Sequence, residues 1–222
     1  MAAEAVPDGG IEFASRLLSW FSGNRRHFPW RREKDPFRVI VAEKLLQQTS
    51  YGHVLKAYGA FFQRFPDARA LAEADASEIE AAIRRLGFQR QRARQLKALA
   101  QELISRHGGL VPGTKEGLKS LSGVGEYVAS AVLCFAFGTD EPVVDINVRR
   151  VVGRFFGWEG LKDSEIAERL RSLIPAGKGR EFNWALIDFS ALICSRKPKC
   201  KKCPLLDACS YARKAGIHAT SH

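Results

Sequence analysis

The predicted fold depends on the stretch Leu118-Lys-Ser-Leu-Ser-Gly-Val-Gly-Glu-Tyr-Val-Ala-Ser-Ala-Val-Leu-Cys134 and on Val143-Val-Asp-Ile-Asn147, which follows it. Residues 118–121 predict the end of a short helix, and the apolar face of residues 126–137 predicts a second helix. Between them, Gly123-Val-Gly125 predicts a hairpin, because glycine allows a sharp turn. The glycines also leave N–H groups uncovered at the start of the second helix, where the helix dipole favours an anion such as phosphate. Taken alone, the motif fits an ordinary turn between packed helices equally well.

Length and charge restrict the possibilities for the whole chain. With 222 residues and 45% hydrophobic content, the chain can form one large or two small domains with a real core. Its 35 Lys and Arg residues exceed its 24 Asp and Glu residues, which gives a formal net charge of +11. This excess favours a polyanionic partner, nucleic acid first and an acidic membrane second. A soluble basic protein without such a partner is the alternative.

Targeting signals are not evident in the sequence. No apolar run reaches the roughly 18 residues that a membrane-spanning helix needs. Residues 1–10 lack a basic start followed by an apolar block, so we expect no secretory signal.

Apolar residues recur at helical spacing along the chain, and no segment shows the strict alternation of a strand, so the predicted fold class is all-α. Asp35-Pro36 predicts the start of one helix, whose buried side includes Ile40 and Leu45. Glu43 lies next to that apolar stripe. Its carboxylate is either half-buried with a raised pKa or, as is more common, in water at the edge of the stripe.

Polar residues predict where several other helices begin. Ser77-Glu-Ile-Glu80 matches a capping box, and Ser164 is expected to cap a later helix. Residues 89–106 predict a long helix with a basic start that includes Arg90 and Arg92.

The C-terminal part of the chain carries a cysteine cluster of the form C-x5-C-x2-C-x5-C, made of Cys194, Cys200, Cys203 and Cys209. Such crowding favours a metal centre in a reducing compartment over a disulfide scaffold. Structural zinc more often uses two separated C-x2-C pairs, whereas one pair flanked by single cysteines favours a [4Fe–4S] cluster. Zinc and four reduced structural thiols remain alternatives. The remaining cysteine, Cys134, is expected to pack in the core.

Together, the hairpin, the following Val-Asp and the four cysteines resemble the endonuclease III superfamily of DNA glycosylases. Leu121-Ser-Gly-Val-Gly125 resembles that family's hairpin, with Ser122 where proline is usual, and Val144-Asp145 resembles the segment with its catalytic aspartate. The first cysteine gap, five residues, is shorter than usual in the family, which affects the loop rather than the ligands. The resemblance spans roughly residues 11–212. The segments that resemble the branch holding adenine glycosylases and thymine/uracil mismatch glycosylases are Phe28-Pro-Trp-Arg31, Ala42-Glu-Lys-Leu-Leu-Gln-Gln-Thr49 and Phe189-Ser-Ala-Leu-Ile-Cys194.

The resemblance implies two helical domains with a DNA-binding cleft between them. A six-helix barrel would take residues 29–139, with the helix-hairpin-helix at about 118–137, and an iron–sulfur cluster domain would combine residues 1–28 with 140–222. The implied partner is double-stranded DNA with a mismatched or damaged base, bound by a monomer. The implied location is cytoplasmic, and nucleoid-associated if the source is prokaryotic.

The resemblance also implies roles for particular side chains. Asp145 would stabilise the positive charge that develops on the sugar and would help to direct water. Glu43 matches the position of the acid in the adenine glycosylases and would protonate or hydrogen-bond the leaving base. Tyr127 stands where members that also cut the backbone carry a lysine nucleophile, and a phenol cannot form that imine. We therefore predict a monofunctional glycosylase. Lys44 and Lys119 are the nearest spare amines in the sequence.

The excised base is predicted to be thymine or uracil opposite guanine. Tyr127, Gln91-Arg-Ala-Arg-Gln-Leu-Lys97 and Gly52-His-Val54 resemble the mismatch glycosylases, whereas Gln47-Gln48-Thr49 resembles the adenine branch, which is the alternative. A third possibility is a DNA-binding iron–sulfur protein without catalytic activity. The expected DNA contacts are Gln47, Gln48, Gly123, Val124, Gly125, Arg149, Lys199, Lys201 and Lys202.

Overall fold

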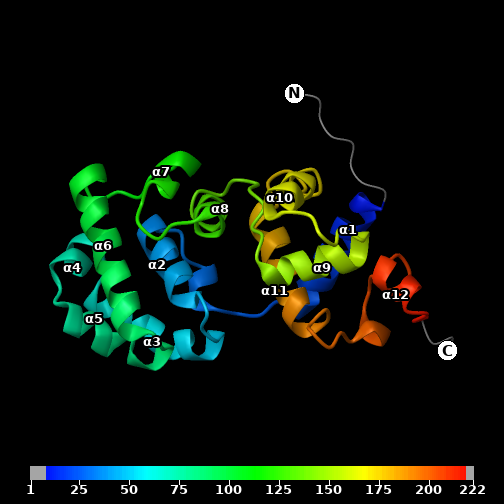
Figure 1. The fold of residues 1–222 in the computed structure, drawn as a ribbon, viewed down its shortest axis with the longest axis horizontal. Coiled ribbons are helices and arrows are strands. Elements are labelled where there is room, and N and C mark those ends of the chain that lie inside the picture. Colours follow the sequence, from blue (N-terminus) through cyan, green and yellow to red (C-terminus); the bar gives the residue numbers. More distant parts are fainter. Residues whose placement is uncertain (1–8, 219–222) are drawn as a thin grey trace. The chain divides into compact units, whose positions relative to one another are not determined.

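The structure, a computed structural model, describes residues 9–218, and these residues form helices without any β-strand (Figure 1). The predicted all-α class is therefore confirmed. Residues 1–8, most of the stretch in which we expect no secretory signal, lie outside the described residues. None of the helices in residues 9–218 combines the length and the apolar character that a membrane span requires.

The chain divides into two compact units. The first, His27–Phe137, is here called the hairpin unit, and the second, Met1–Arg26 with Gly138–His222, is called the cysteine unit. These borders lie two residues from the predicted ones at 28/29 and 139/140. The assignment of the two units as a barrel and a cluster domain stays a prediction.

The hairpin unit is built around α2, which packs against α3, α6 and α8. Asp35 caps α2 by accepting a hydrogen bond from the Phe37 backbone N–H at 2.9 Å, and Pro36 occupies the first helical position, as predicted. Figure 1 shows α6 running alongside α4 and α5. The elements of this unit are η1 (Pro29–Arg31), α2 (Pro36–Leu46), α3 (Tyr51–Arg64), α4 (Ala68–Glu73), α5 (Ala76–Ala82), η2 (Arg84–Leu86), α6 (Gln89–His107), α7 (Lys115–Lys119) and α8 (Glu126–Phe135).

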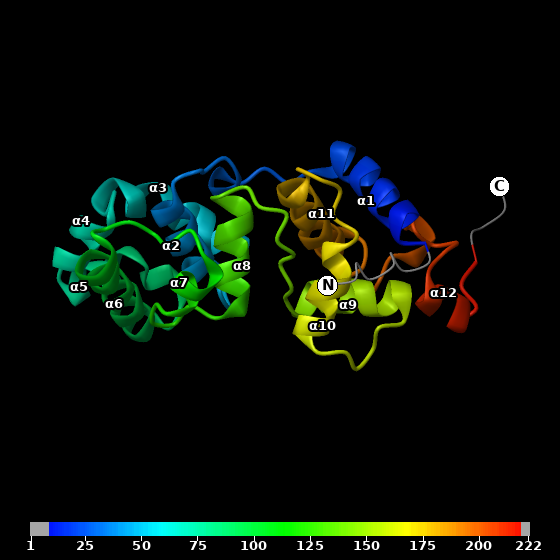
Figure 2. The same ribbon diagram turned by 90° about the horizontal axis from the view of Figure 1, so that it is seen from above.

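The cysteine unit joins the N-terminal helix of the chain to its C-terminal third. Helix α1 packs against α11, and α9 packs against both α11 and α12 (Figure 2). Its core includes the fully buried Phe13, Leu17, Val152 and Phe182. The elements of this unit are α1 (Gly10–Asn24), α9 (Ile146–Phe156), α10 (Asp163–Arg171), α11 (Gly179–Leu192), η3 (Cys200–Lys202) and α12 (Ser210–Lys214).

Two predicted helix starts are wrong. Helix α5 begins at Ala76, before the predicted box at Ser77, and the backbone N–H of Asp75 donates to the Glu78 carboxylate at 3.0 Å. Helix α10 already includes Ser164, and the Lys162 N–H donates to Glu165 at 2.8 Å. In both cases a glutamate one turn into the helix fixes the start earlier than the serine pattern indicates.

Truncation of a buried leucine in α2 tests the central place of this helix. Leu45 is completely buried, whereas Leu55 in α3 is 47% exposed. We expect Leu45→Ala to lower the free energy of unfolding of the hairpin unit by about 2–5 kcal/mol, because it leaves a cavity. The matched control Leu55→Ala should change it by less than about 1 kcal/mol. Urea denaturation measures both, and equal effects would contradict the packing described.

Candidate functional site

The predicted hairpin joins α7 to α8 through residues 120–125. Gly123 has φ +71°, a left-handed conformation that favours glycine. Val124 is buried, and its N–H donates to the Leu121 carbonyl oxygen at 3.1 Å. Gly125 is exposed and precedes the first residue of α8, which ends at Phe135 rather than at the predicted 137. The first amides of such a helix have no partners within the helix, so an anion can bind there.

Charged side chains hold this hairpin from two helices. Lys44 of α2 is only 3% exposed, and its Nζ donates to the Gly123 carbonyl oxygen at 2.7 Å. Burial lowers the pKa of the Lys44 ammonium, and the charge of Arg92 lowers it further. On α6, Glu102 accepts hydrogen bonds from the N–H of Ser122, at 2.8 Å, and from its hydroxyl. These bonds lower the pKa of Glu102, and they use an N–H that a proline at this position would lack.

A second loop, residues 47–49, follows α2 and carries the two candidate glutamines. Gln48 is exposed and has φ +52°, which is uncommon for a residue other than glycine. The loop is held by Arg92, a buried residue of α6. Its guanidinium donates to the carbonyl oxygens of Lys44, at 2.7 Å, and Gln47, at 2.9 Å, and to the Thr49 hydroxyl at 3.0 Å. The sequence placed Arg92 among the basic residues of this helix and did not indicate its burial.

Phe88 is a candidate contact that the sequence analysis missed. Its ring is 66% exposed, and its φ of +50° makes it, with Gln48, one of the two non-glycine residues with positive φ in the described chain. The 47–49 loop reaches the same region, because the Thr49 hydroxyl donates to the Leu86 carbonyl oxygen at 3.2 Å. Strained backbone at exposed side chains is frequent at functional sites. The sequence feature that could have indicated this contact is an aromatic residue directly after Gly87, at the start of a basic helix.

Two of the three candidate catalytic residues lie in the hairpin unit. Glu43 is 6% exposed on α2, so its side chain is buried rather than in water at the edge of the apolar stripe. Tyr127 is half-buried at the second position of α8. Lys119, one of the spare amines, pairs with Glu126 at 2.9 Å, while Lys44 is bound to Gly123.

The third candidate, Asp145, lies in the cysteine unit as the N-cap of α9. Its carboxylate accepts hydrogen bonds from the backbone N–H groups of Asn147, at 2.9 Å, and Val148, at 2.7 Å. The Asn147 side-chain amide also donates to it at 2.8 Å, and Arg150 donates to that amide's oxygen at 3.0 Å. The carboxylate is therefore fixed in orientation, which the sequence analysis did not anticipate.

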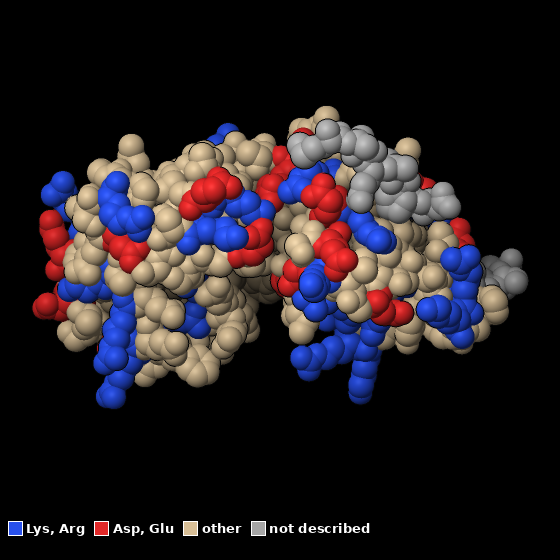
Figure 3. Space-filling model, turned by 45° about the horizontal axis from the view of Figure 1, so that its top comes forward, with Lys and Arg blue, Asp and Glu red and all other residues tan. Residues whose placement is uncertain are grey.

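The basic residues of the cysteine unit that are predicted to contact DNA are all exposed, but they differ in their ion pairing. Arg149 pairs with Asp163 at 2.9 Å, so part of its charge is already balanced. Lys199, Lys201 and Lys202 are exposed in and beside η3. On the face drawn in Figure 3, Lys and Arg side chains lie among Asp and Glu side chains rather than in one continuous basic patch. Phosphate contacts on that face are therefore expected to be local.

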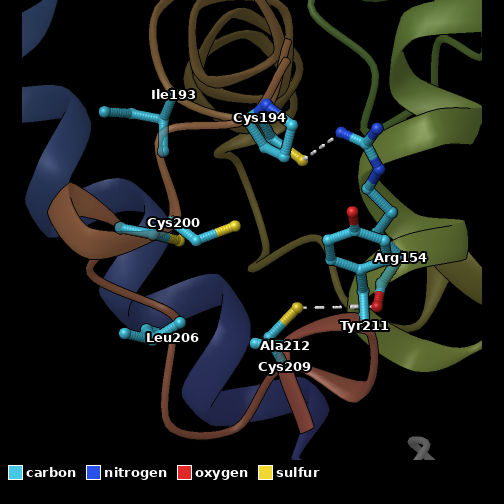
Figure 4. A pocket seen from close by; sticks show the side chains of 10 residues that line it. Arg154, Ile193, Cys194, Cys200, Leu206, Cys209, Tyr211 and Ala212 are labelled. Carbon is cyan, nitrogen blue, oxygen red and sulfur yellow. Dashed lines mark hydrogen bonds between the residues drawn. The ribbon is translucent and has the colours of Figure 1, made fainter. Parts of the chain in front are cut away.

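The four predicted metal ligands line one pocket of the cysteine unit (Figure 4). In Figure 4 the sulfur atoms of Cys194, Cys200 and Cys209 point toward a shared space. Arg154 borders it, donating to Cys194 Sγ at 3.6 Å and to the Ser195 carbonyl oxygen at 2.6 Å. Within residues 9–218, no three Cys, His, Asp or Glu side chains meet the spacing for a single bound ion. The other lining residues are Ile193, Pro198, Cys203, Leu206, Tyr211 and Ala212.

The environment of these thiols bears on metal binding. Burial raises the pKa of Cys194, and it raises the pKa of Cys203 to about 12. The thiols of Cys194 and Cys203 are therefore protonated at neutral pH. Because metals bind thiolates, binding at this pocket must release protons. Cys134, by contrast, is completely buried in α8, as expected for a core residue.

Comparison with known protein families identifies the group to which this arrangement belongs. The family model described as "HhH-GPD superfamily base excision DNA repair protein" matches residues 41–176. This chain belongs to the HhH-GPD superfamily. The predicted resemblance is thereby confirmed, and the matched region includes residues 41–46 of α2, the hairpin and Asp145.

Individual members of the superfamily are similar over most of the chain. A thymine/uracil-DNA glycosylase of Methanothermobacter thermautotrophicus is 42% identical over 207 residues, which cover 91% of this chain and 94% of that protein. An adenine DNA glycosylase of Mycolicibacterium smegmatis is 37% identical over 210 residues, which cover 91% of this chain and 70% of that protein. The solved structure of a thermostable thymine-DNA glycosylase matches with a TM-score of 0.90 and 40% identity, covering 95% of this chain and all of that one.

Two substitutions of Asp145 distinguish the contribution of its helix cap from that of its negative charge. Asp145→Ala should lower the free energy of unfolding by about 1 kcal/mol, because α9 loses its N-cap. Asp145→Asn should be close to wild type, since asparagine is an equally good N-cap. Thermal denaturation measures both variants. Equal destabilisation by the two substitutions would show that the cap bonds do not hold the helix start.

Proposed function

We propose that this protein is a DNA glycosylase of base excision repair that hydrolyses the N-glycosidic bond of thymine or uracil opposite guanine and leaves an abasic site. The observation that carries the proposal is the 42% identity, over 91% of the chain, to a protein named thymine/uracil-DNA glycosylase. The working form is a monomer bound to double-stranded DNA. This activity implies a cytoplasmic location, with the nucleoid if the source is prokaryotic.

Two features of the hairpin unit support binding to a duplex from which a base has been extruded. The amides at the start of α8 suit one backbone phosphate, held by Gly123, Val124 and Gly125. Gln47, Gln48 and Phe88 would enter the space that the flipped base leaves, since an exposed ring can replace lost stacking. Arg149, Lys199, Lys201 and Lys202 would contact further phosphates from the cysteine unit.

The chemistry proposed is hydrolysis at the sugar C1′ atom. The bond from C1′ to the base nitrogen breaks, and the bonding electrons leave with the base. Glu43 supplies the proton or hydrogen bond that the leaving base needs. Asp145 stabilises the positive charge on the sugar and orients the water whose oxygen bonds to C1′. The proton that this water loses passes to the surrounding solvent. The fixed orientation of the Asp145 carboxylate supports this role, because oriented groups lose little entropy in the transition state.

The absence of lyase activity is part of the proposal. A strand-cutting member needs an amine to form an imine with the sugar, and Tyr127 offers a phenol. The spare amines are already engaged, Lys44 with the Gly123 carbonyl oxygen and Lys119 with Glu126.

We assign Cys194, Cys200, Cys203 and Cys209 as the ligands of a [4Fe–4S] cluster. The shared pocket and its all-thiol donor set fit such a group. When bound, the cluster would supply a rigid centre rather than reaction chemistry. The chain's own loop residues, Lys199, Lys201 and Lys202, would then be held in place toward DNA.

A second candidate is excision of adenine. The 37% identity to an adenine DNA glycosylase and the Gln47-Gln48-Thr49 sequence favour it. Both activities belong to the same superfamily, so a substrate assay distinguishes them.

Single-turnover base release tests the proposed substrate. Duplexes with G·T, G·U, A·G and A opposite 8-oxoguanine are incubated with excess enzyme and then resolved with and without alkali. We expect release of thymine and uracil, with strand breaks only after alkali. Release of adenine alone would establish the second candidate, and breaks without alkali, together with a borohydride-trapped adduct, would contradict the monofunctional proposal.

Loss of the Asp145 charge should abolish catalysis while the protein stays folded. Asp145→Asn is expected to lower the single-turnover rate by a factor of about 10³ or more, because the sugar cation loses its counter-charge. Its affinity for the same duplex should stay close to wild type. Unchanged base release by this variant would remove Asp145 from the mechanism.

The cluster assignment predicts the metal content of two cysteine variants. Cys203→Ala should lose iron and the visible absorbance of an iron–sulfur cluster, while Cys134→Ala, a matched change in the core of α8, should keep both. Iron analysis and absorbance of the purified proteins measure this. Zinc in place of iron in the unaltered protein would contradict the assignment.

A further inference from the structure

Lys44 is a buried cation in α2, whose other buried residues are apolar except for Glu43. Its neighbours Ile40, Val41 and Leu45 are completely buried, and Lys44 itself is 3% exposed. Removing an ammonium group from water is unfavourable unless strong partners replace the water. A methionine has a similar length and no such penalty. Retention of lysine at this position therefore indicates a task other than filling space.

The bond that Lys44 makes identifies that task. Its Nζ lies 2.7 Å from the carbonyl oxygen of Gly123, in the middle of the hairpin. The fit is close, because a Cβ atom added to Gly123 would lie 2.9 Å from the same Nζ. A planar peptide whose carbonyl is held toward α2 cannot rotate freely. The bond thus fixes the backbone immediately before Gly125 and the first amides of α8.

The backbone of Lys44 is fixed as well. Arg92 donates to the Lys44 carbonyl oxygen at 2.7 Å and to the Gln47 carbonyl oxygen at 2.9 Å. Lys44 and Arg92 are both buried cations that donate hydrogen bonds to neutral backbone oxygens. Lys44 therefore stands between the two loops, with its side chain on the hairpin and its main chain held together with the 47–49 loop.

We propose that Lys44 is a positioning residue that holds the hairpin in the conformation able to bind a DNA phosphate, at the expense of fold stability. It contacts neither the phosphate nor the base. The inference rests on the proposed function only in that DNA is the ligand of the hairpin. The proposed role of Lys44 differs from that of exposed lysines, which would attract DNA by charge alone.

The test compares Lys44→Met with Lys56→Met, which removes the same charge from the exposed part of α3. Measurements are the melting temperature, the Kd for a duplex at fixed salt, the single-turnover rate at saturating enzyme, and hydrogen exchange of amides 122–127 without DNA. Lys44→Leu is the second variant in case the methionine variant does not fold.

The proposal predicts an unusual combination of effects. Lys44→Met should melt at the wild-type temperature or above it, because a buried charge is removed. Its Kd should rise about tenfold, as expected for a lost hydrogen bond that orients the binding loop. Exchange of amides 122–127 should become faster, and the saturated rate should change by less than about twofold. Lys56→Met should leave hairpin exchange unchanged.

Several outcomes would overturn the inference. Wild-type Kd and hairpin exchange in Lys44→Met would show that the bond positions nothing, and a lost saturated rate at unchanged Kd would place Lys44 in the chemistry. Failure of both Lys44 variants to fold would reduce the residue to a structural one. A wild-type protein that binds no duplex would defeat the proposed function instead, while the exchange of amides 122–127 would still decide the role of Lys44.

Discussion

The hydrogen bond from Lys44 to Gly123 is the interaction on which the hairpin unit depends for its candidate DNA-binding side. It joins a largely buried helix of the unit to a loop whose buried apolar residues are Leu121 and Val124. A glycine hairpin is flexible by composition, and only an external constraint can give it one conformation. Lys44 from α2 and Glu102 from α6 supply that constraint, and hydrogen bonds from Arg92 order the 47–49 loop.

This arrangement places stability and function in opposition within a single helix. The apolar residues of α2 stabilise the unit, whereas Lys44 and Glu43 are buried at a cost in free energy. Local conflicts of this kind are expected where a site must be prepared before its ligand arrives. At Asp145, stability and proposed function are compatible, because the hydrogen bonds that cap α9 also orient the carboxylate for its proposed role.

Local patterns in the sequence predicted much of this protein. The glycines of the hairpin, the Asp35-Pro36 helix start and the cysteine spacing each act within a few residues, so they are visible without a fold. The burial of Lys44 and Arg92 was not predictable, because it depends on contacts between α2, α6 and the hairpin, which lie far apart in the sequence. Phe88 was missed because its exposure and left-handed backbone are properties of the folded chain.

In the proposed function, the start of α8 and the 47–49 loop are prepared to receive DNA. A crystal structure of the protein on a duplex with a non-hydrolysable thymidine analogue opposite guanine tests it most directly. We expect a phosphate on the amides after Gly125, with Gln48 and Phe88 in the vacated space and the Lys44–Gly123 bond kept. A duplex bound with the hairpin facing solvent, or a hairpin rearranged away from Lys44, would contradict it.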